Sequence, residues 1–421
     1  MRLVVVACLI LISADVYSCK CGSSSLEIES KASQAIFHGL VTSVYGDTYQ
    51  VKVLHLWKGE IKTGVVQLIQ KRTSCETRLF VPGVEYVFFL SNTVHTDAIS
   101  NCSRTAEYNS ATADRAMLNK MFTPEYAPTK FVCFTIDDLP VVSYGITDSV
   151  YQQNLTSRLI ASLRKNNIPA VGFVNEYKAF DAAGHQKEIH FQVEMMKQWL
   201  DNGLELGNHT FSHPDYNLVN FKTFSEDILR GETITRRLLK AKGKELRYFR
   251  HPFLHMGNSQ AKADSLNQFL EQHGYTIAPV TIDNDDYLFA LAYKRASVKG
   301  DKAQMQQIGK DYVDYMEKKV QYFEQQASRF FGRDIKHILL LHASLLNADY
   351  TDALADMFRK NNYGFISLEE ALTDRAYETT ITAFGNWGIS WIHRWVLSSG
   401  RDRSFFNGEP EVPEYITKLA Q

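Results

Sequence analysis

The chain has 421 residues, more than one hydrophobic core usually holds, so two domains are expected. Hydrophobic residues make up 45% of it and charged residues 22%, which is the composition of a globular protein rather than of a disordered one. The formal net charge is -1, and without a basic excess nucleic acid is not an expected partner.

The first 18 residues have the pattern of a signal peptide. Arg2 supplies a positive charge, an apolar run covers residues 3–12, and small and polar residues precede Cys19. This apolar run is too short to span a bilayer comfortably, and no later stretch is long and uncharged enough to be a transmembrane helix. We therefore predict an exported protein, either periplasmic or extracellular.

Export makes disulfides possible, and the chain has six cysteines. Cys8 lies in the predicted signal peptide, and Cys133 lies in the apolar run FVCFTI, where we expect a buried thiol. The other four predict two disulfides in a small N-terminal domain, and their spacing alone allows three pairings. These four are Cys19, Cys21, Cys75 and Cys102. Lipidation of Cys19 is the alternative, because residues 16–19 (VYSC) loosely resemble a bacterial lipobox.

Residues 19–124 have the pattern of a domain of short strands. The predicted strands are AIFHGLVTSVYG, TYQVKVLHLWKG, VVQLIQ and EYVFFL, with turn signals at Gly46, Gly59 and Pro82-Gly83 between them. Short strands at near-regular spacing suggest a small β-barrel. A more helical segment, ATADRAMLNKMF, follows.

The same residues resemble a known module. A mature N-terminus of the form Cys-x-Cys, followed by IFHGLV, VLHLWKG and PGVEYVFFL, resembles the netrin-like module shared with tissue inhibitors of metalloproteinases. The resemblance implies an OB-type barrel with disulfides Cys19–Cys75 and Cys21–Cys102. It leaves two roles open: inhibition of a metalloprotease through the free amino group of Cys19, or a spacer or a module that binds protein or glycan. We favour the second role, because a fold does not determine a function.

Residues 125–421 change to strands that alternate with amphipathic helices. The predicted strands are FVCFTI, IPAVGFVN, ELGNH, RYFRHP, TIAPVTID and HILLLHAS. The helix after the first strand has Leu155, Leu159, Ile160 and Leu163 on one face. A helical segment, FSEDILRGETITRRLLKAKG, covers residues 224–243, and the longest helical segment runs from about residue 302 to residue 330. This alternation predicts a parallel sheet, open or closed into a barrel.

Polar residues follow these strands and predict a site. Carboxyl ends of parallel strands meet on one face of the fold, so side chains placed there lie close together. The residues are Asp137, Asp138, His209, His213, Arg250, Asp283, Asp286 and His342. Asp283 fits a turn carboxylate as well as a site residue.

His209 and His213, in the segment HTFSH, are four residues apart, and this spacing places two side chains on one face of a helical turn. Asp138 is the natural third ligand. Two histidines and one carboxylate suit a divalent cation and leave room for water and substrate.

The neighbouring residue types predict the rest of a hydrolytic mechanism. Asp137 is the expected general base, and Arg250 is expected to pair with it and hold it ionised. His342 is the expected acid that protonates the leaving amine, with Asp286 as the group that orients its imidazole.

Five segments in order, FTIDDLP, HTFSH, RHPF, DNDDY and ILLLH, resemble the motifs of the polysaccharide deacetylase domain (NodB homology, carbohydrate esterase family 4). The resemblance implies a distorted (β/α) barrel and zinc-type hydrolysis of N-acetyl groups on amino sugars, with the roles given above. It implies substrate contacts at Pro252, Phe253, Tyr287 and Leu341, and a backbone N–H of Phe253 in the oxyanion hole. Leu139, Phe253 and Tyr287 depart from the family motifs, which bears on substrate choice rather than on the reaction.

The predicted function is removal of acetyl groups from an N-acetylated glycan, chitin-like or peptidoglycan, with a divalent metal, zinc, as cofactor. The alternative is a secreted binding or metalloprotease-inhibitory protein that acts through its netrin-like domain, with a second domain that only binds sugar. The presence of both Asp137 and His342 argues against that alternative.

Overall fold

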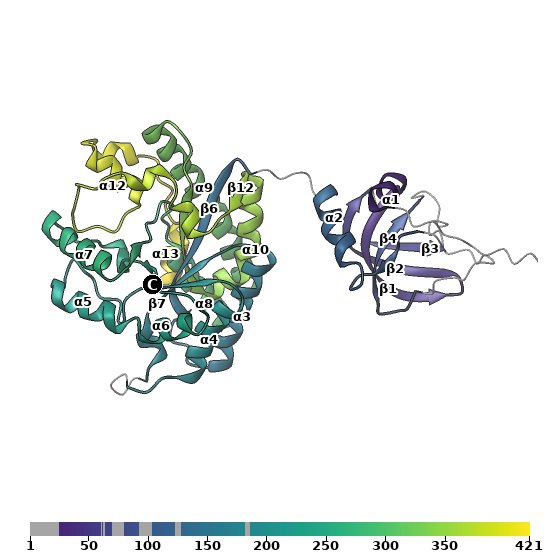
Figure 1. The fold of residues 1–421 in the computed structure, drawn as a ribbon, viewed down its shortest axis with the longest axis horizontal. Coiled ribbons are helices and arrows are strands. Elements are labelled where there is room, and N and C mark those ends of the chain that lie inside the picture. Colours follow the sequence, from purple (N-terminus) through teal and green to yellow (C-terminus); the bar gives the residue numbers. More distant parts are fainter. Residues whose placement is uncertain are drawn as a thin grey trace, which may run out of the picture. The chain divides into compact units, whose positions relative to one another are not determined.

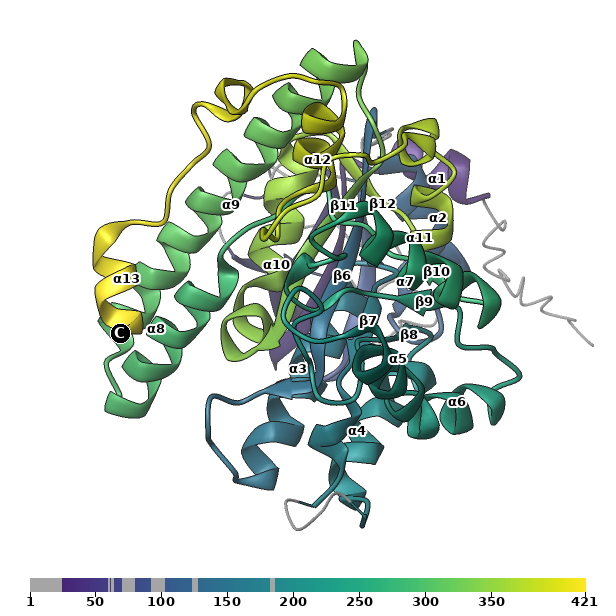
Figure 2. The ribbon, with the colours of Figure 1, turned by 90° about the vertical axis from the view of Figure 1, so that its left-hand side faces the viewer.

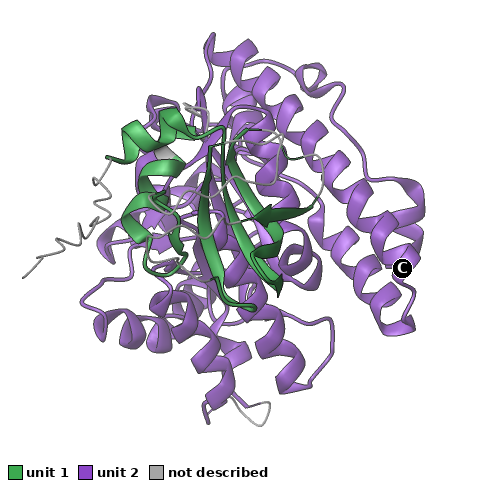
Figure 3. Cartoon of the chain, turned by 90° about the vertical axis from the view of Figure 1, so that its right-hand side faces the viewer, with its two compact units in different colours: residues 1–126 green, residues 127–421 purple. Residues whose placement is uncertain are grey.

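The structure is a computed structural model that describes residues 25–59, 61, 64–69, 80–91, 103–122, 128–181 and 186–421. The chain divides into two compact units, Met1–Tyr126 and Ala127–Gln421 (Figures 1 and 3). The predicted signal peptide lies outside the described residues. The cysteines for which disulfides or lipidation are predicted, Cys19, Cys21, Cys75 and Cys102, also lie outside them. No helix among the described ranges combines the length and the apolar character needed to cross a bilayer.

The smaller unit is built on an antiparallel sheet with the strand order β3-β2-β1-β4-β5. Its strands are β1 (Ala35–Tyr45), β2 (Thr48–Lys58), β3 (Val65–Ile69), β4 (Glu85–Leu90) and β5 (Ala106–Glu107), and its helices are α1 (Leu26–Ala32) and α2 (Thr112–Phe122). The four predicted strands and the predicted helix are confirmed. The described strands form an open path, and the OB-type barrel stays a prediction.

Alternating side chains of this sheet serve two small cores. Phe37 and Phe88 pack on one face, whereas Val87 packs on the other face with Leu26 of α1 and Leu118 of α2. The helices therefore cover one face of the sheet.

The larger unit is built on a seven-stranded parallel sheet with the order β10-β9-β8-β7-β6-β11, and β12 also pairs with β6. The strands are β6 (Lys130–Val142), β7 (Val171–Val174), β8 (Glu205–Asn208), β9 (Tyr248–Phe249), β10 (Thr276–Ile277), β11 (His337–Ser344) and β12 (Tyr363–Phe365). Figure 2 shows these strands at the centre of the unit, with helices around them.

The helices of this unit are α3 (Ser149–Lys165), α4 (His190–Asp201), α5 (Phe221–Arg230), α6 (Thr233–Lys240), α7 (Gln260–Gln272), α8 (Asp286–Lys299), α9 (Lys302–Phe331), α10 (Leu345–Lys360), α11 (Leu368–Ala371), α12 (Trp391–Ser398) and α13 (Glu414–Ala420). The predicted face of α3 is buried, and α9 is the long predicted helix. These expectations are confirmed.

One backbone segment, residues 276–282, joins the two edges of the sheet. Ala278 N donates to the carbonyl of Phe249 in β9 at 2.8 Å, and Ile282 N donates to the carbonyl of Ile338 in β11 at 3.0 Å. The sheet therefore curls, as expected for the predicted α/β fold, and its edges meet at this segment.

Alternating residues of β6 pack into two different cores of the larger unit. Val132, Phe134 and Ile136 belong to the large cluster that includes the helices, whereas Cys133 packs with Phe173 and other residues of neighbouring strands. The thiol of Cys133 is free and buried, as predicted.

Two predicted boundaries are wrong, and both lie next to the site. The strand β6 does not end before Asp137 but continues to Val142, with a register shift where Asp138 adopts a left-handed backbone (φ 65°). The helix predicted over residues 224–243 is broken after α5, at Gly231. A Cβ atom at Gly231 would lie 2.4 Å from the backbone N of Phe211, so only glycine allows α5 to approach that loop so closely.

Candidate metal and acid–base site

The predicted site residues come together at the carboxyl ends of the parallel strands. Asp137 and Asp138 lie in β6, His209 follows β8, and His342 lies in β11, directly opposite Asp137 in the strand register. Arg250 follows β9, and Asp286 is the first residue of α8.

Asp138, His209 and His213 form a group that could hold a metal ion. One ligand atom from each lies within 4.8 Å of the others, and no second group of this kind occurs among the described residues. Oδ1 of Asp138 is 3.9 Å from Nε2 of His209 and 3.8 Å from Nε2 of His213. The sequence-predicted ligands are therefore neighbours in space.

The helical-turn explanation for the spacing of the two histidines is wrong, because both lie in a loop. Thr210 and His213 have left-handed backbones, with φ of 67° and 58°. Asp227 of α5 holds this loop: its carboxylate accepts hydrogen bonds from the backbone N and the hydroxyl of Ser212, and its carbonyl accepts from Phe211 N. The loop thus bends back so that both imidazoles face Asp138.

Hydrogen bonding fixes which nitrogen His209 can offer. Its Nδ1 is 2.8 Å from the carbonyl oxygen of Arg250, which can only accept, so Nδ1 carries the proton and Nε2 carries the lone pair. Burial lowers the pKa of His209 well below its usual value and also lowers that of His213. Both imidazoles are therefore neutral, which is the form that binds metals.

Asp138 is ionised beside them. Burial opposes its charge, but the positive charges of Lys178 and His342 outweigh burial, so its pKa lies below the usual value. Nζ of Lys178 also donates to the backbone carbonyl of Asp138 at 2.7 Å. One carboxylate and two neutral imidazoles fit a divalent cation such as zinc.

Asp137 lies deeper, with 3% of its surface exposed, and burial raises its pKa to about 6. Its Oδ1 accepts no hydrogen bond from the described residues. Arg250 was expected to pair with it, but the atoms Nε and Oδ1 are 3.9 Å apart, and Nη2 of Arg250 donates instead to Thr135 Oγ1 at 2.7 Å. The pair is therefore electrostatic, without a direct hydrogen bond that fixes the carboxylate.

His342 is bound to Asp286 as predicted from the sequence. Its Nδ1 is 2.6 Å from Oδ1 of Asp286, and its backbone N donates to Oδ2 at 2.9 Å. Burial opposes the imidazolium charge, but Asp286 outweighs burial and raises the pKa of His342 to about 9. Asn347, which also donates to Oδ2 of Asp286 at 2.8 Å, was not predicted, because nothing in the sequence distinguishes it.

The four predicted substrate contacts divide into two exposed and two buried residues. Phe253 is 53% exposed, has a left-handed backbone (φ 56°), and packs its ring 4.5 Å from that of His213. Tyr287 is 47% exposed. Pro252 and Leu341 are buried, and Leu341 belongs to the main core, so their contact with substrate stays a prediction.

Asp283 does not join the site. Its carboxylate accepts a hydrogen bond from the backbone N of the next residue, Asn284, at 2.9 Å. Burial raises its pKa to about 7. This local bond agrees with the alternative of a turn carboxylate.

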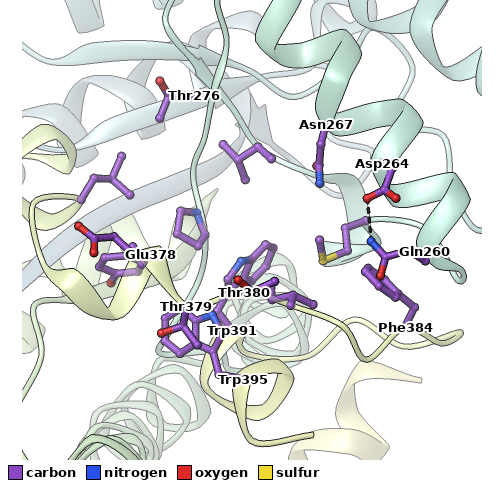
Figure 4. Close-up of a pocket in the computed structure, with 16 residues that line it drawn as sticks. Gln260, Asp264, Asn267, Thr276, Glu378, Thr379, Thr380, Phe384, Trp391 and Trp395 are labelled. Carbon is purple, nitrogen blue, oxygen red and sulfur yellow. Dashed lines mark hydrogen bonds between the residues drawn. The ribbon is translucent and has the colours of Figure 1, made fainter. Parts of the chain in front are cut away.

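At least three cavities lie in the larger unit, and two of them are considered for the site. A cleft of about 340 Å³ beside Asp138 is lined by Tyr144, Tyr177 and Lys178, none of which was predicted. A cavity of about 480 Å³ between α7 and α12 is lined by residues that include Asp264, Glu378 and Trp391 (Figure 4). No predicted site residue lines that second cavity, so we assign the site by the ligand group and not by cavity size.

Comparison with known proteins finds similarity over part of the chain. Three similar solved structures each cover 58% of this chain. A family 4 carbohydrate esterase from Bacillus anthracis has 19% identity, 83% of its own chain covered and a TM-score of 0.35, and a family 4 carbohydrate esterase from Streptomyces lividans in complex with acetate has 19% identity, 97% covered and a TM-score of 0.36. A family 4 pseudoenzyme from Bacillus anthracis has 16% identity, 66% of its own chain covered and a TM-score of 0.36. No curated protein matches the chain. Residues 125–278 match the family model described as polysaccharide deacetylase. This match supports a polysaccharide deacetylase domain that includes Asp137 and the three candidate ligands, and it ends before Asp286 and His342.

Proposed function

We propose that this protein is a metal-dependent hydrolase that removes acetyl groups from an N-acetylated glycan. The observation that carries the proposal is the grouping of Asp138, His209 and His213 beside Asp137 and the Asp286-bound His342. The family match over residues 125–278 supports the same chemistry. Within this proposal the protein is exported, because its substrates are polymers of cell walls and extracellular matrices.

The three candidate ligands would hold a divalent cation, for which we propose zinc. When bound, such an ion polarises the acetyl carbonyl and lowers the pKa of a neighbouring water. Asp137 takes a proton from the water whose oxygen attacks the carbonyl carbon. With a pKa near 6, its carboxylate is ionised at neutral pH and still basic enough to accept that proton.

His342 acts in the second half of the reaction. With a pKa near 9, its imidazole is protonated at neutral pH, and Asp286 holds Nδ1–H, so Nε2–H is the group left to donate. It gives its proton to the sugar nitrogen as the C–N bond breaks, which leaves acetate and a free amine. In this scheme the backbone N–H of Phe253 stabilises the oxyanion.

The direct test is release of acetate by the zinc-loaded full chain. Substrates are N-acetylglucosamine oligomers and glycan strands of peptidoglycan, so that both predicted substrate classes are covered. Release from at least one of them is expected. A protein that contains zinc and releases acetate from neither would rule out the proposal.

Two substitutions separate the base from the ligands. Asp137→Asn should keep zinc but lower the rate of acetate release by about 10²- to 10⁴-fold, the usual contribution of a general base. His209→Ala should lose both zinc and activity, because it removes a ligand. Zinc content, measured by mass spectrometry, and the rate are recorded on the same samples, with exposed His190→Ala as the matched control. Loss of zinc from Asp137→Asn would contradict its role as base alone.

A further inference from the structure

The cleft beside Asp138 contains a positively charged side chain, Lys178, to which the proposed reaction assigns no role. The cleft lies between residues 141–145, at the end of β6, and residues 177–178, after β7. Its lining combines polar and aromatic side chains, among them Ser143, Tyr144 and Tyr177, with the apolar Val141 and Val142. Lys178 and Asp138 are the charged residues of this lining.

Lys178 has no carboxylate partner in the part of the chain that the structure describes. Its Nζ donates to the backbone carbonyl of Asp138 at 2.7 Å, whereas the Asp138 carboxylate faces His209 and His213. An ammonium group has three N–H donors, so two of them stay available for other groups. The side chain of Lys178 is half-buried, so its ammonium group has limited contact with water.

Asp286, another carboxylate of the site, already has partners of its own. Asp286 accepts hydrogen bonds from the imidazole and backbone of His342 and from Asn347. The other charged residue of this lining is Asp138, a candidate metal ligand, so a cation bound there would compensate its charge and leave Lys178 without an opposite charge. A half-buried cation with free donors, in the cleft beside a candidate metal ligand, suits an anionic group of a substrate that binds there.

We propose that Lys178 forms a subsite for a carboxylate of the glycan, so that the preferred substrates are acidic N-acetylated glycans rather than neutral chitin-like ones. The inference rests on the proposed deacetylase function and refines it. Two sugar chemistries carry such a carboxylate next to an N-acetyl sugar: a lactyl ether, as in peptidoglycan strands, and a uronic acid.

The test compares substrates that differ only in this charge. The probe is an oligosaccharide of alternating N-acetylglucosamine and N-acetylmuramic acid with free lactyl carboxylates, and its partner has those carboxylates reduced to alcohols. A second pair alternates N-acetylglucosamine with glucuronic acid or with its reduced form. The zinc-loaded wild-type chain should show a higher kcat/KM on one acidic form by about 10- to 100-fold, as expected for a charged hydrogen bond. The pair that shows the preference identifies the source of the carboxylate.

Substitutions assign the preference to Lys178. Lys178→Gln should bring the acid-to-neutral ratio of kcat/KM close to one, and Lys178→Arg should retain most of it. Lys299→Gln, which removes an exposed lysine at the end of α8, controls for net charge and should keep the ratio. Equal losses on both substrates would mean that Lys178 only supports the backbone of Asp138, and would overturn the inference. A wild-type chain without an acidic preference would overturn it as well.

Equilibrium binding separates this inference from the proposed function. Isothermal titration of the zinc-loaded chain with the same pairs should give tighter binding of the acidic form, and Lys178→Gln should remove the difference. If acetate is released from no substrate, the proposed function fails, and the binding data then decide whether the subsite exists. Equal affinity for both forms would reject the subsite even in an active enzyme.

Discussion

At the scale of single residues, the pKa values of Asp137 and His342 are shifted so that each group is in the form it needs. Burial raises the pKa of Asp137 to about 6, and Asp286 raises that of His342 to about 9. The base must be deprotonated and the acid protonated. We therefore expect kcat/KM for acetate release to increase with pH through about 6 and to decrease through about 9.

The substitution Asp286→Asn tests whether Asp286 sets the pH above which kcat/KM decreases. Without the carboxylate, the pKa of His342 should fall from about 9 toward the ordinary value of about 6.5, so the alkaline limb of the profile should move down by as much as about 2.5 pH units. The acid limb, set by Asp137, should move little. Rates measured from about pH 5 to about pH 10 give both limbs. A uniformly lower rate with an unmoved alkaline limb would show that Asp286 only supports the fold.

At the scale of elements, the sequence predicted the helices whose apolar faces are buried. It missed the turns that depend on an unusual backbone conformation. The spacing of apolar residues predicted α3 and α9, because the buried residues of these two helices repeat with the helical period. The bend in β6 and the HTFSH loop were missed, since Asp138 and Thr210 adopt left-handed backbones that their residue types do not signal.

Within the site, the sequence predicted some residues and missed others. The ligands and the acid–base pair were predicted from motif residues at strand ends. Lys178 and Asn347 were not, because each acts through a neighbour that is distant in sequence. Leu341 was assigned to substrate from its motif alone, and only the packing of β11 shows that it is buried.

The loop that carries the ligand histidines depends on α5. Asp227 accepts three hydrogen bonds from this loop, donated by Phe211 N, Ser212 N and the Ser212 hydroxyl. Asp227→Ala removes the two bonds to Ser212, so we expect zinc affinity to fall by about 10- to 100-fold, as for other groups that orient ligands. Competition with a chromogenic chelator measures the affinity, and far-UV circular dichroism checks the fold. Glu226→Ala, an exposed neighbour on the same helix, should leave the affinity unchanged. Unaltered affinity in Asp227→Ala would mean that the loop holds its shape without α5.

At the scale of the whole molecule, all candidate catalytic and ligand residues lie in the unit Ala127–Gln421. This unit has its own sheet and its own main core. A shortened chain of residues 128–421 should therefore fold, bind zinc and release acetate from short oligosaccharides at close to the full-length rate. A folded fragment without activity on short substrates would show that the smaller unit contributes to the site.

Three buried histidines make the stability of the larger unit sensitive to acid. Burial lowers the pKa of His251, His337 and His393 to about 3, whereas an imidazole in the unfolded chain has a pKa of about 6.5. Below that value the unfolded chain binds protons that the folded chain does not. Each histidine therefore contributes stability that is present above about pH 6.5 and is lost as the pH falls toward 3, by about 1.4 kcal/mol per pH unit.

His337→Asn isolates one of these contributions. The amide can replace Nδ1 beside Thr281 Oγ1, now 3.2 Å away, but it does not titrate. The variant should be less stable than wild type near pH 7.5 because it fills less space, and the gap in free energy of unfolding should close by about 1.4 kcal/mol per pH unit below about 6.5. Urea unfolding followed by tryptophan fluorescence at several pH values gives both curves. Thr281→Val, which keeps the imidazole, should instead lower stability by a similar amount at every pH. Parallel curves for wild type and His337→Asn would show that His337 takes up its proton without unfolding the protein.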